Sequence, residues 1–237
     1  MFNKYLEFIK NNKLKSIIIF IGLFIIYEYL SLPNNSIILL RTKNPTTTAL
    51  MEIRKDEAEK SYKKFVKRNK WIPLKNVSVY LKNAIIVAED GTFYRHEGVD
   101  WYEIEESIEA YVERDKPLRG ASTITQQLAK NLYLSPSKNP LRKIKEWIIT
   151  IRIEKLLSKK RILELYVNLI EWGNGIYGAE EASRIYFGKS ASQLTREEAI
   201  RLAAAIPNPL RMNPHSTSKG YIRRVARLTQ KMERAEY

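Results

Sequence analysis

The longest apolar run of the chain lies near its N-terminus, where residues 17–27 contain no charged side chain. The wider segment 16–32 is just long enough for a helix to span a bilayer. Lysines dominate residues 1–15, so the positive-inside rule predicts a cytoplasmic N-terminus and a chain that crosses the membrane once. Because no small-residue cleavage site follows the run, we favour a retained transmembrane helix over a cleaved signal peptide.

Beyond this segment, residues 33–45 indicate a tether, and the remainder has the pattern of one domain, 46–237. Within it, apolar residues recur at helical spacing and follow residue types that cap helices. Thr195 with Glu198 forms a capping box, and Asn139-Pro140 is a typical helix start. We predict helices near residues 46–69, 78–88, 100–113, 122–131, 139–157, 158–168, after the Gly-containing turn at 171–178, 196–206 and 220–235. No strand pair or repeat is evident, so the predicted fold class is mostly α.

Composition adds a strongly basic character, because 41 Lys+Arg against 26 Asp+Glu give a formal net charge of +15. Residues 33–237 remain basic without the membrane helix, which indicates an anionic partner at or beyond the outer face of the membrane. The chain has no Cys and two His, which excludes disulfides and thiolate metal sites. A structural zinc site is equally poorly supported.

The most informative polar positions follow an apolar stretch, where residues 84–88 lead directly to Glu89 and Asp90. A carboxylate pressed against apolar walls has a raised pKa, which is how a Glu becomes a general base near neutral pH. The alternative is a structural carboxylate at a helix end, bonded to local backbone or to Arg95. For an isolated Glu-Asp pair, that alternative is the commoner outcome.

A second polar stretch covers residues 120–134 and combines a Gly-led entry with hydroxyls, paired amides and a lysine. We expect Ser122 to cap a helix on which Thr123, Gln127 and Lys130 share one face. A face of hydroxyl, amide and ammonium groups suits a sugar or a phosphate. A solvated helix face would show the same pattern.

The predicted helix at 139–157 carries a third cluster. Its apolar positions recur at spacings of three and four residues and form one face: Leu141, Ile144, Ile148 and Ile151. Arg142, Lys143 and Glu146 lie together on the opposite face. They form either a surface ion-pair cluster of small energetic value or a clamp for a phosphate. Together with a candidate base and a membrane helix, the clamp favours transfer at a sugar carbon whose leaving group is a phosphate.

These stretches resemble the peptidoglycan glycosyltransferase (transglycosylase) family, family 51 of the glycosyltransferases, which includes a domain of the class A penicillin-binding proteins. The first family motif is matched by Glu89, Asp90, Phe93, His96, Gly98 and Asp100. The second is matched by Gly120, Ser122, Thr123, Ile124, Thr125, Gln126, Gln127, Lys130 and Asn131, and the third by Arg142, Lys143 and Glu146. Residues 159–189 and 202–214 look like the fourth and fifth motifs, in the family's order.

The resemblance implies that the protein polymerises lipid II into β-1,4 glycan strands by inverting transfer, with release of undecaprenyl pyrophosphate. Glu89 matches the general base that takes the proton from the acceptor 4-hydroxyl, and Glu146 matches the glutamate beside the leaving pyrophosphate. The cations that would neutralise the pyrophosphate, alone or with Mg²⁺ or Mn²⁺, are Lys130, Arg142 and Lys143. The other matched positions expected to bind substrate are Asp90, Phe93, Ser122, Thr123, Gln127 and Asn131.

The family fold is mostly α, with a lysozyme-like large lobe and a smaller jaw close to the membrane. The implied partners are lipid II, the growing glycan chain, the membrane and cell-wall synthesis proteins, with no nucleic acid and no tightly bound cofactor. The catalytic domain would lie on the outer side of the inner membrane. We expect His96 to hydrogen-bond within the first motif, and the loop at 113–121 to act as a lid.

Two alternatives share some of these features. A lysozyme-like muramidase or lytic transglycosylase would have the same fold and paired acids, but it needs no cationic clamp. A non-catalytic basic binder of lipid or nucleic acid would not need Glu89 and Glu146. The chain stops at Tyr237, and its S-x-x-K matches are not followed by K-T-G. We therefore expect polymerisation without cross-linking.

Overall fold

The computed structural model describes residues 12–114, 122–137 and 139–235, so most of the expected lid at 113–121 lies outside the described residues. It divides into two compact units, with the boundary between Ser36 and Ile37. The first contains helix α2 (Lys13–Leu30), most of which belongs to a stretch, Lys15–Leu39, that is long and apolar enough to cross a membrane. Phe20 on this helix is 70% exposed, so the apolar side chains of α2 are not part of a protein core.

The second unit begins earlier than the expected domain boundary at residue 46. Helix α3 (Asn34–Leu39) crosses the boundary, and Ile37 is completely buried. Arg161 holds the residues that follow α3, donating to the backbone oxygens of Leu40 at 2.8 Å and Lys43 at 2.9 Å. The later part of the expected tether is therefore packed against the domain.

The helix expected over residues 46–69 is shorter in the structure. Helix α4 (Ala49–Lys60) begins at Thr48, whose hydroxyl accepts the backbone N–H of Met51 at 3.2 Å. It ends where Tyr62 adopts a positive φ of 53°, a backbone geometry that terminates helices. Residues beyond it turn toward a small sheet instead of continuing the helix.

The prediction that no strands pair is wrong. A three-stranded sheet joins β1 (Arg68–Asn69), β2 (Glu171–Gly173) and β3 (Ile176–Tyr177) in the order β1-β3-β2. The first pair is parallel and the second antiparallel. Strands of two or three residues are too short to show the alternation from which strands are recognised in a sequence. The expected Gly-containing turn is the β2–β3 connection, where Gly175 has a φ of 70°.

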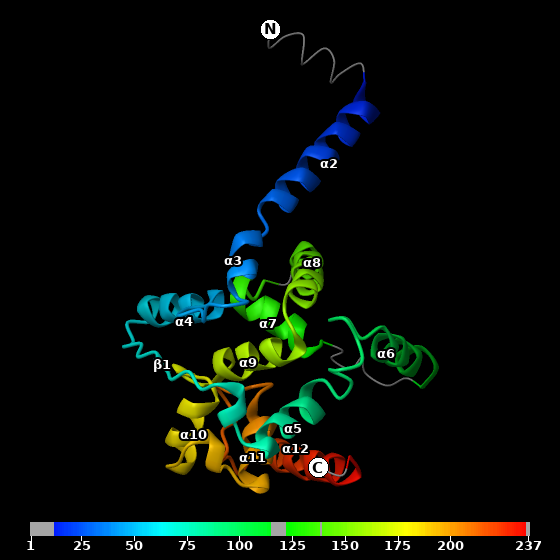
Figure 1. The fold of residues 1–237 in the computed structure, drawn as a ribbon. Helices are drawn as coiled ribbons and strands as arrows, with labels where there is room; N and C mark the ends of the chain where they lie inside the picture. The colour runs from blue at the N-terminus through cyan, green and yellow to red at the C-terminus, as the bar shows by residue number, and fades with distance from the viewer. Residues whose placement is uncertain (1–11, 115–121, 138, 236–237) are drawn as a thin grey trace. The chain divides into compact units, whose positions relative to one another are not determined.

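The remaining elements are helical, which confirms the predicted mostly-α fold (Figure 1). They are η1 (Leu74–Asn76), α5 (Val79–Glu89), α6 (Trp101–Arg114), α7 (Ile124–Tyr133), α8 (Pro140–Leu156), α9 (Lys159–Leu169), α10 (Ala179–Phe187), η2 (Ala191–Gln193), α11 (Arg196–Ala205) and α12 (Lys219–Arg234). Helix α5 packs against α11 and α12, while α7 packs against α8 and α9. These two groups of helices position the candidate site.

Most predicted helix starts are confirmed, with one shift. Asn139, Ser158 and Thr195 each cap the expected helix through a side-chain oxygen. Helix α7, however, is capped by Thr123 and not by Ser122. The hydroxyl of Thr123 accepts the N–H of Gln126, and the Gln126 side chain accepts the N–H of Thr123 in return. The capping box fits only this register.

The apolar face expected on α8 is turned outward. Leu141, Ile144 and Ile151 are 40%, 51% and 42% exposed. The buried positions are Glu146, Ile149, Thr150 and Ile153, so a carboxylate lies on the protein-facing side of this helix. Spacing alone shows that a helix has an apolar face, but not which face the rest of the protein covers.

Candidate active site

Glu89 is the last residue of α5, and its carboxylate lies between two helices that are distant in sequence. The side chain is 9% exposed. Nε2 of Gln127 in α7 donates to Oε2 at 2.9 Å, and Nη2 of Arg224 in α12 donates to Oε1 at 2.9 Å. The partners of this carboxylate are therefore Gln127 and Arg224, and Arg95 is not among the partners found in the described residues.

Gln127 is itself fixed from the other side. The hydroxyl of Tyr166 in α9 donates to Oε1 of Gln127 at 2.9 Å, and Tyr166 is completely buried. Burial, and then the charge of Glu89, raise the pKa of Tyr166 well above its ordinary value, so the phenol stays protonated. Because an ionised carboxylate can only accept hydrogen bonds, the Gln127 amide is oriented with its NH₂ group toward Glu89, and its oxygen is left to accept the Tyr166 hydroxyl.

Burial raises the pKa of Glu89 above that of an ordinary glutamate. The hydrogen bond from Gln127 and the charges of Arg224 and Lys130 oppose this increase. The result is a carboxylate that binds a proton more tightly than an exposed glutamate does, which suits a general base. A hollow of about 210 Å³ opens beside it, lined in part by Ser122 and Lys231.

The predicted clamp on α8 is assembled around a buried acid. Glu146 is 2% exposed, and its carboxylate accepts hydrogen bonds from Nη1 of Arg142 at 2.6 Å and from the ammonium of Lys143. The two cations are more open, with 22% of the Arg142 side chain and 37% of the Lys143 side chain exposed. A buried carboxylate with two partly exposed cations differs from a surface ion-pair cluster. It can hold both cations in place for an external anion.

Lys130 in α7 connects the clamp to the candidate base. Its pKa is lowered, first by burial; the charge of Glu146 opposes this, and the charges of Arg142 and Lys143 add to it. The charge of Glu89 also acts on Lys130. Because Gln127 and Lys130 are three residues apart on one helix, α7 carries one contact to the base and one cation beside the clamp.

Comparison of the sequence with known proteins shows its family. A family model described as Transglycosylase matches residues 56–233. The chain belongs to this family.

Relatives named biosynthetic peptidoglycan transglycosylase cover most of the chain. That of Azoarcus sp. (strain BH72) is 48% identical over 169 residues, which are 71% of this chain and 73% of the relative. That of Dechloromonas aromatica (strain RCB) is 42% identical over 216 residues, 91% of this chain and 93% of the relative. That of Nitrosospira multiformis is 44% identical over 190 residues, with 80% and 82% covered. The resemblance inferred from the motifs is confirmed, and the muramidase alternative is not favoured.

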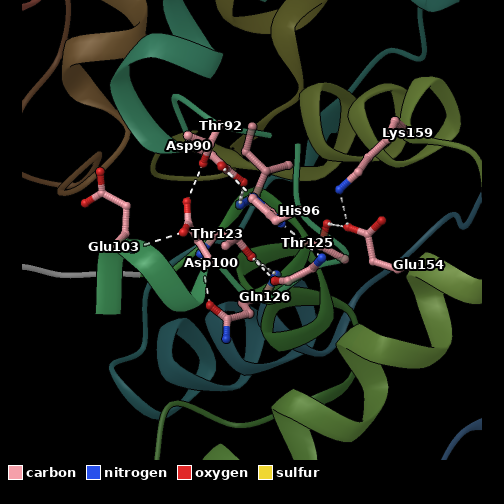
Figure 2. A network of polar contacts seen from close by, with 12 residues as sticks. Asp90, Thr92, His96, Asp100, Glu103, Thr123, Thr125, Gln126, Glu154 and Lys159 are labelled. Carbon is pink, nitrogen blue, oxygen red and sulfur yellow. Dashed lines mark hydrogen bonds and ion pairs between the residues drawn. The ribbon is translucent and has the colours of Figure 1, made fainter. Parts of the chain in front are cut away.

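Several first-motif residues of this transglycosylase form a polar network with residues at the start of α7 (Figure 2). Asp90 accepts the backbone N–H of Ile124 at 2.9 Å and contacts Nε2 of His96 at 2.9 Å. The hydroxyl of Thr123 donates to the backbone oxygen of Gly98 at 2.6 Å. The network fixes the start of α7 against the end of α5, so Gln127 reaches Glu89. The expectation that His96 bonds within its motif is confirmed.

This network does not fit a metal ion as it is arranged. Asp90, His96 and Asp100 have ligand atoms within 4.8 Å of one another. However, Nδ1 of His96 accepts the N–H of Gly98 at 3.0 Å, so Nε2 carries the hydrogen and donates to Asp90. Neither nitrogen has a lone pair free for a cation. Participation of Mg²⁺ or Mn²⁺ with the substrate's pyrophosphate stays a prediction.

Three residues expected to bind substrate have internal roles in this structure. Phe93 is completely buried, and the ammonium of Lys159 lies 4.5 Å from its ring centroid. Both carboxylate oxygens of Asp90 are bonded within the protein, as is the hydroxyl of Thr123. In this structure these side chains position and pack neighbouring groups, and their contacts with substrate stay predictions. Ser122 accepts the Lys143 ammonium at 3.3 Å, and Asn131 is half-buried, so their substrate contacts stay predictions.

The sequence interpretation missed Arg224, and it included Tyr166 only as part of the fourth motif, residues 159–189. Arg224 lies 135 residues after Glu89 on a helix with several basic residues, where no single one stands out. The one available signal is the position of Arg224 between buried Tyr221 and Leu228, which places it near the packed side of α12. Its partner could be found only from the fold.

Proposed function

We propose that this transglycosylase polymerises lipid II, the lipid-linked disaccharide-peptide, into β-1,4 glycan strands. The observation that carries the proposal is that one helix, α7, joins a buried carboxylate to a cationic cluster. Gln127 bonds Glu89 at 2.9 Å, and Lys130 lies within the electrostatic reach of both Glu89 and Glu146. A base and a cationic cluster at neighbouring positions suit displacement of a pyrophosphate by a hydroxyl.

In the proposed reaction, Glu89 takes the proton from the 4-hydroxyl of the acceptor sugar. The acceptor oxygen forms a bond to C1 of the donor with inversion, and the C1–oxygen bond to the pyrophosphate breaks. The electron pair leaves with the pyrophosphate, whose growing charge is stabilised by Lys130, Arg142 and Lys143. Glu146 holds the two α8 cations in position, while its own oxygens stay occupied.

The proposed topology puts the N-terminus in the cytoplasm and the catalytic unit on the outer side of the membrane. The lysines before α2 support this orientation. The exposed apolar face of α8, with Leu141, Ile144 and Ile151, supports contact between the catalytic unit and the bilayer that holds the substrate. Because the chain has no Cys, a single Cys introduced at Asn35 is a clean probe. A membrane-impermeant maleimide should label this Cys in intact cells. Labelling only after lysis would show that the protein has the opposite orientation in the membrane.

The function is tested by incubating the full-length protein with lipid II and separating the products on a gel. Wild type should give long glycan, and Glu89→Gln should give none above background, with an unchanged melting temperature. Glu233→Gln, which alters an exposed acid on α12, is the matched control and should behave as wild type. Cleavage of finished peptidoglycan without use of lipid II would favour the muramidase alternative. Full activity of Glu89→Gln would reject Glu89 as the base.

A further inference from the structure

The last helix of the chain contributes directly to the environment of the proposed base. Arg224 reaches from α12 to Oε1 of Glu89, with an N–O distance of 2.9 Å. Helix α12 is held in place by buried Tyr221, Leu228 and Met232. The hydroxyl of Tyr221 also donates to the backbone oxygen of Arg201 in α11 at 2.8 Å. Arg224 therefore projects from a helix that is fixed on both sides of it.

The two donors to Glu89 come from different elements and contact different oxygens. Gln127 bonds Oε2 from α7, and Arg224 bonds Oε1 from α12, both at 2.9 Å. Two bonds of this kind fix both the plane and the rotation of the carboxylate. Removing one of them would leave the carboxylate free to turn about the bond to the other donor.

Arg224 is also the closest cation to this carboxylate in the described part of the chain. The other charged or titratable groups facing Glu89 or its hollow are Asp90, Asp100, Glu103, Lys130, Tyr166 and Lys231. Of these, Lys130 also lowers the pKa of Glu89 against the effect of burial, but less than Arg224 does. Burial and the guanidinium therefore act in opposite directions on the same group.

We infer that Arg224 is a positioning residue for the base, which orients the Glu89 carboxylate toward the acceptor hydroxyl and stabilises its ionised form. This inference rests on the proposed function of Glu89. In each turnover Glu89 receives one proton from the acceptor and must return it to solvent before the next addition. A fixed guanidinium favours that return, because it interacts more strongly with the carboxylate than with the neutral acid.

The experiment measures polymerisation of lipid II against pH for full-length wild type, Arg224→Gln, Arg224→Lys and Arg227→Gln. An opposite charge at this distance lowers a carboxyl pKa by roughly 1–3 units. Arg224→Gln should therefore move the acid limb of kcat to higher pH by roughly one unit or more, with KM for lipid II changed less than about twofold. Arg224→Lys keeps the cation and should retain most of the wild-type limb. Arg227→Gln removes an exposed charge from the same helix and should leave the limb unmoved.

The outcomes separate the inference from the function on which it rests. A lower melting temperature in Arg224→Gln with an unmoved acid limb would reduce Arg224 to a structural residue. An equal shift of the acid limb in Arg227→Gln would mean that the overall positive charge of α12, and not the contact with Glu89, sets the limb. This would also overturn the inference. If Arg224→Gln does not fold, Arg224→Lys is compared with wild type instead. A lower kcat and an acid limb displaced to higher pH in Arg224→Lys, at normal stability, would contradict the proposed charge role. Full activity of Glu89→Gln would instead reject Glu89 as the base, which is the assignment on which the inference rests.

Discussion

Gln127 donates from its amide nitrogen to Glu89 at 2.9 Å, and its amide oxygen accepts the buried hydroxyl of Tyr166 at the same distance. The Gln127 amide therefore fixes the proposed base relative to a buried phenol of the core. Such support matters because a displacement of about 1 Å in a reacting group can reduce the rate on the order of 10²-fold.

Gln127→Glu should impair the base without disturbing the core. The new carboxylate still accepts the Tyr166 hydroxyl, but it no longer donates to Glu89, and a like charge raises the pKa of Glu89 further. Glu89 must be ionised to accept a proton, so the acid limb of kcat should move to higher pH, and activity should recover as pH rises. The pH–rate profile with lipid II measures this. An unchanged profile would mean that the Gln127–Glu89 bond is unimportant in turnover.

Lys130 should limit activity on the alkaline side. Burial lowers its pKa, so its charge is fully present below the folded-state pKa and is lost as pH rises through a value below that of an ordinary lysine. KM for lipid II should therefore increase at a pH lower than ordinary lysine titration predicts. Lys130→Arg stays charged and should extend the range to higher pH. If KM depends on alkaline pH in the same way for wild type and Lys130→Arg, the change in KM must be assigned to another group.

Lys143→Ala should weaken catalysis more than folding. The ammonium is partly exposed and available to the pyrophosphate, and a charge-assisted hydrogen bond contributes about 1.5–3 kcal/mol. We expect kcat/KM to fall on the order of 10–100-fold, with a small change in melting temperature because Arg142 still pairs with Glu146. Lys155→Ala, on the exposed side of the same helix, is the control. Loss of folding without a specific kinetic defect would make the cluster structural.

Gly98→Ala should destabilise the fold. Gly98 has a φ of 91°, and an added Cβ would lie 2.7 Å from Cγ2 of Thr150 and 2.8 Å from Cγ of Glu154. Backbone strain of this type costs about 1–3 kcal/mol, and the contacts add to it. Chemical denaturation should show a lower free energy of unfolding by at least that amount. Gly220→Ala has open space around its Cβ and should leave the free energy of unfolding close to wild type.

The helical content and the site chemistry were readable in the sequence because they depend on neighbours along the chain. Caps such as Asn139 and Thr195 act within three residues, and the cluster of Arg142, Lys143 and Glu146 is formed by the periodicity of a single helix. The apolar run at 17–27 likewise shows a membrane-spanning candidate by composition alone. Local rules therefore predicted the fold class, the candidate base and the candidate clamp.

Only the tertiary structure decided which groups meet. The Arg224–Glu89 pair joins residues 135 positions apart, and β1 pairs with β3 across more than a hundred residues. The buried state of Phe93 and the outward apolar face of α8 depend on which neighbours cover each surface. Packing assigns these contacts through shape and burial over the whole domain, and no short window of sequence contains that information.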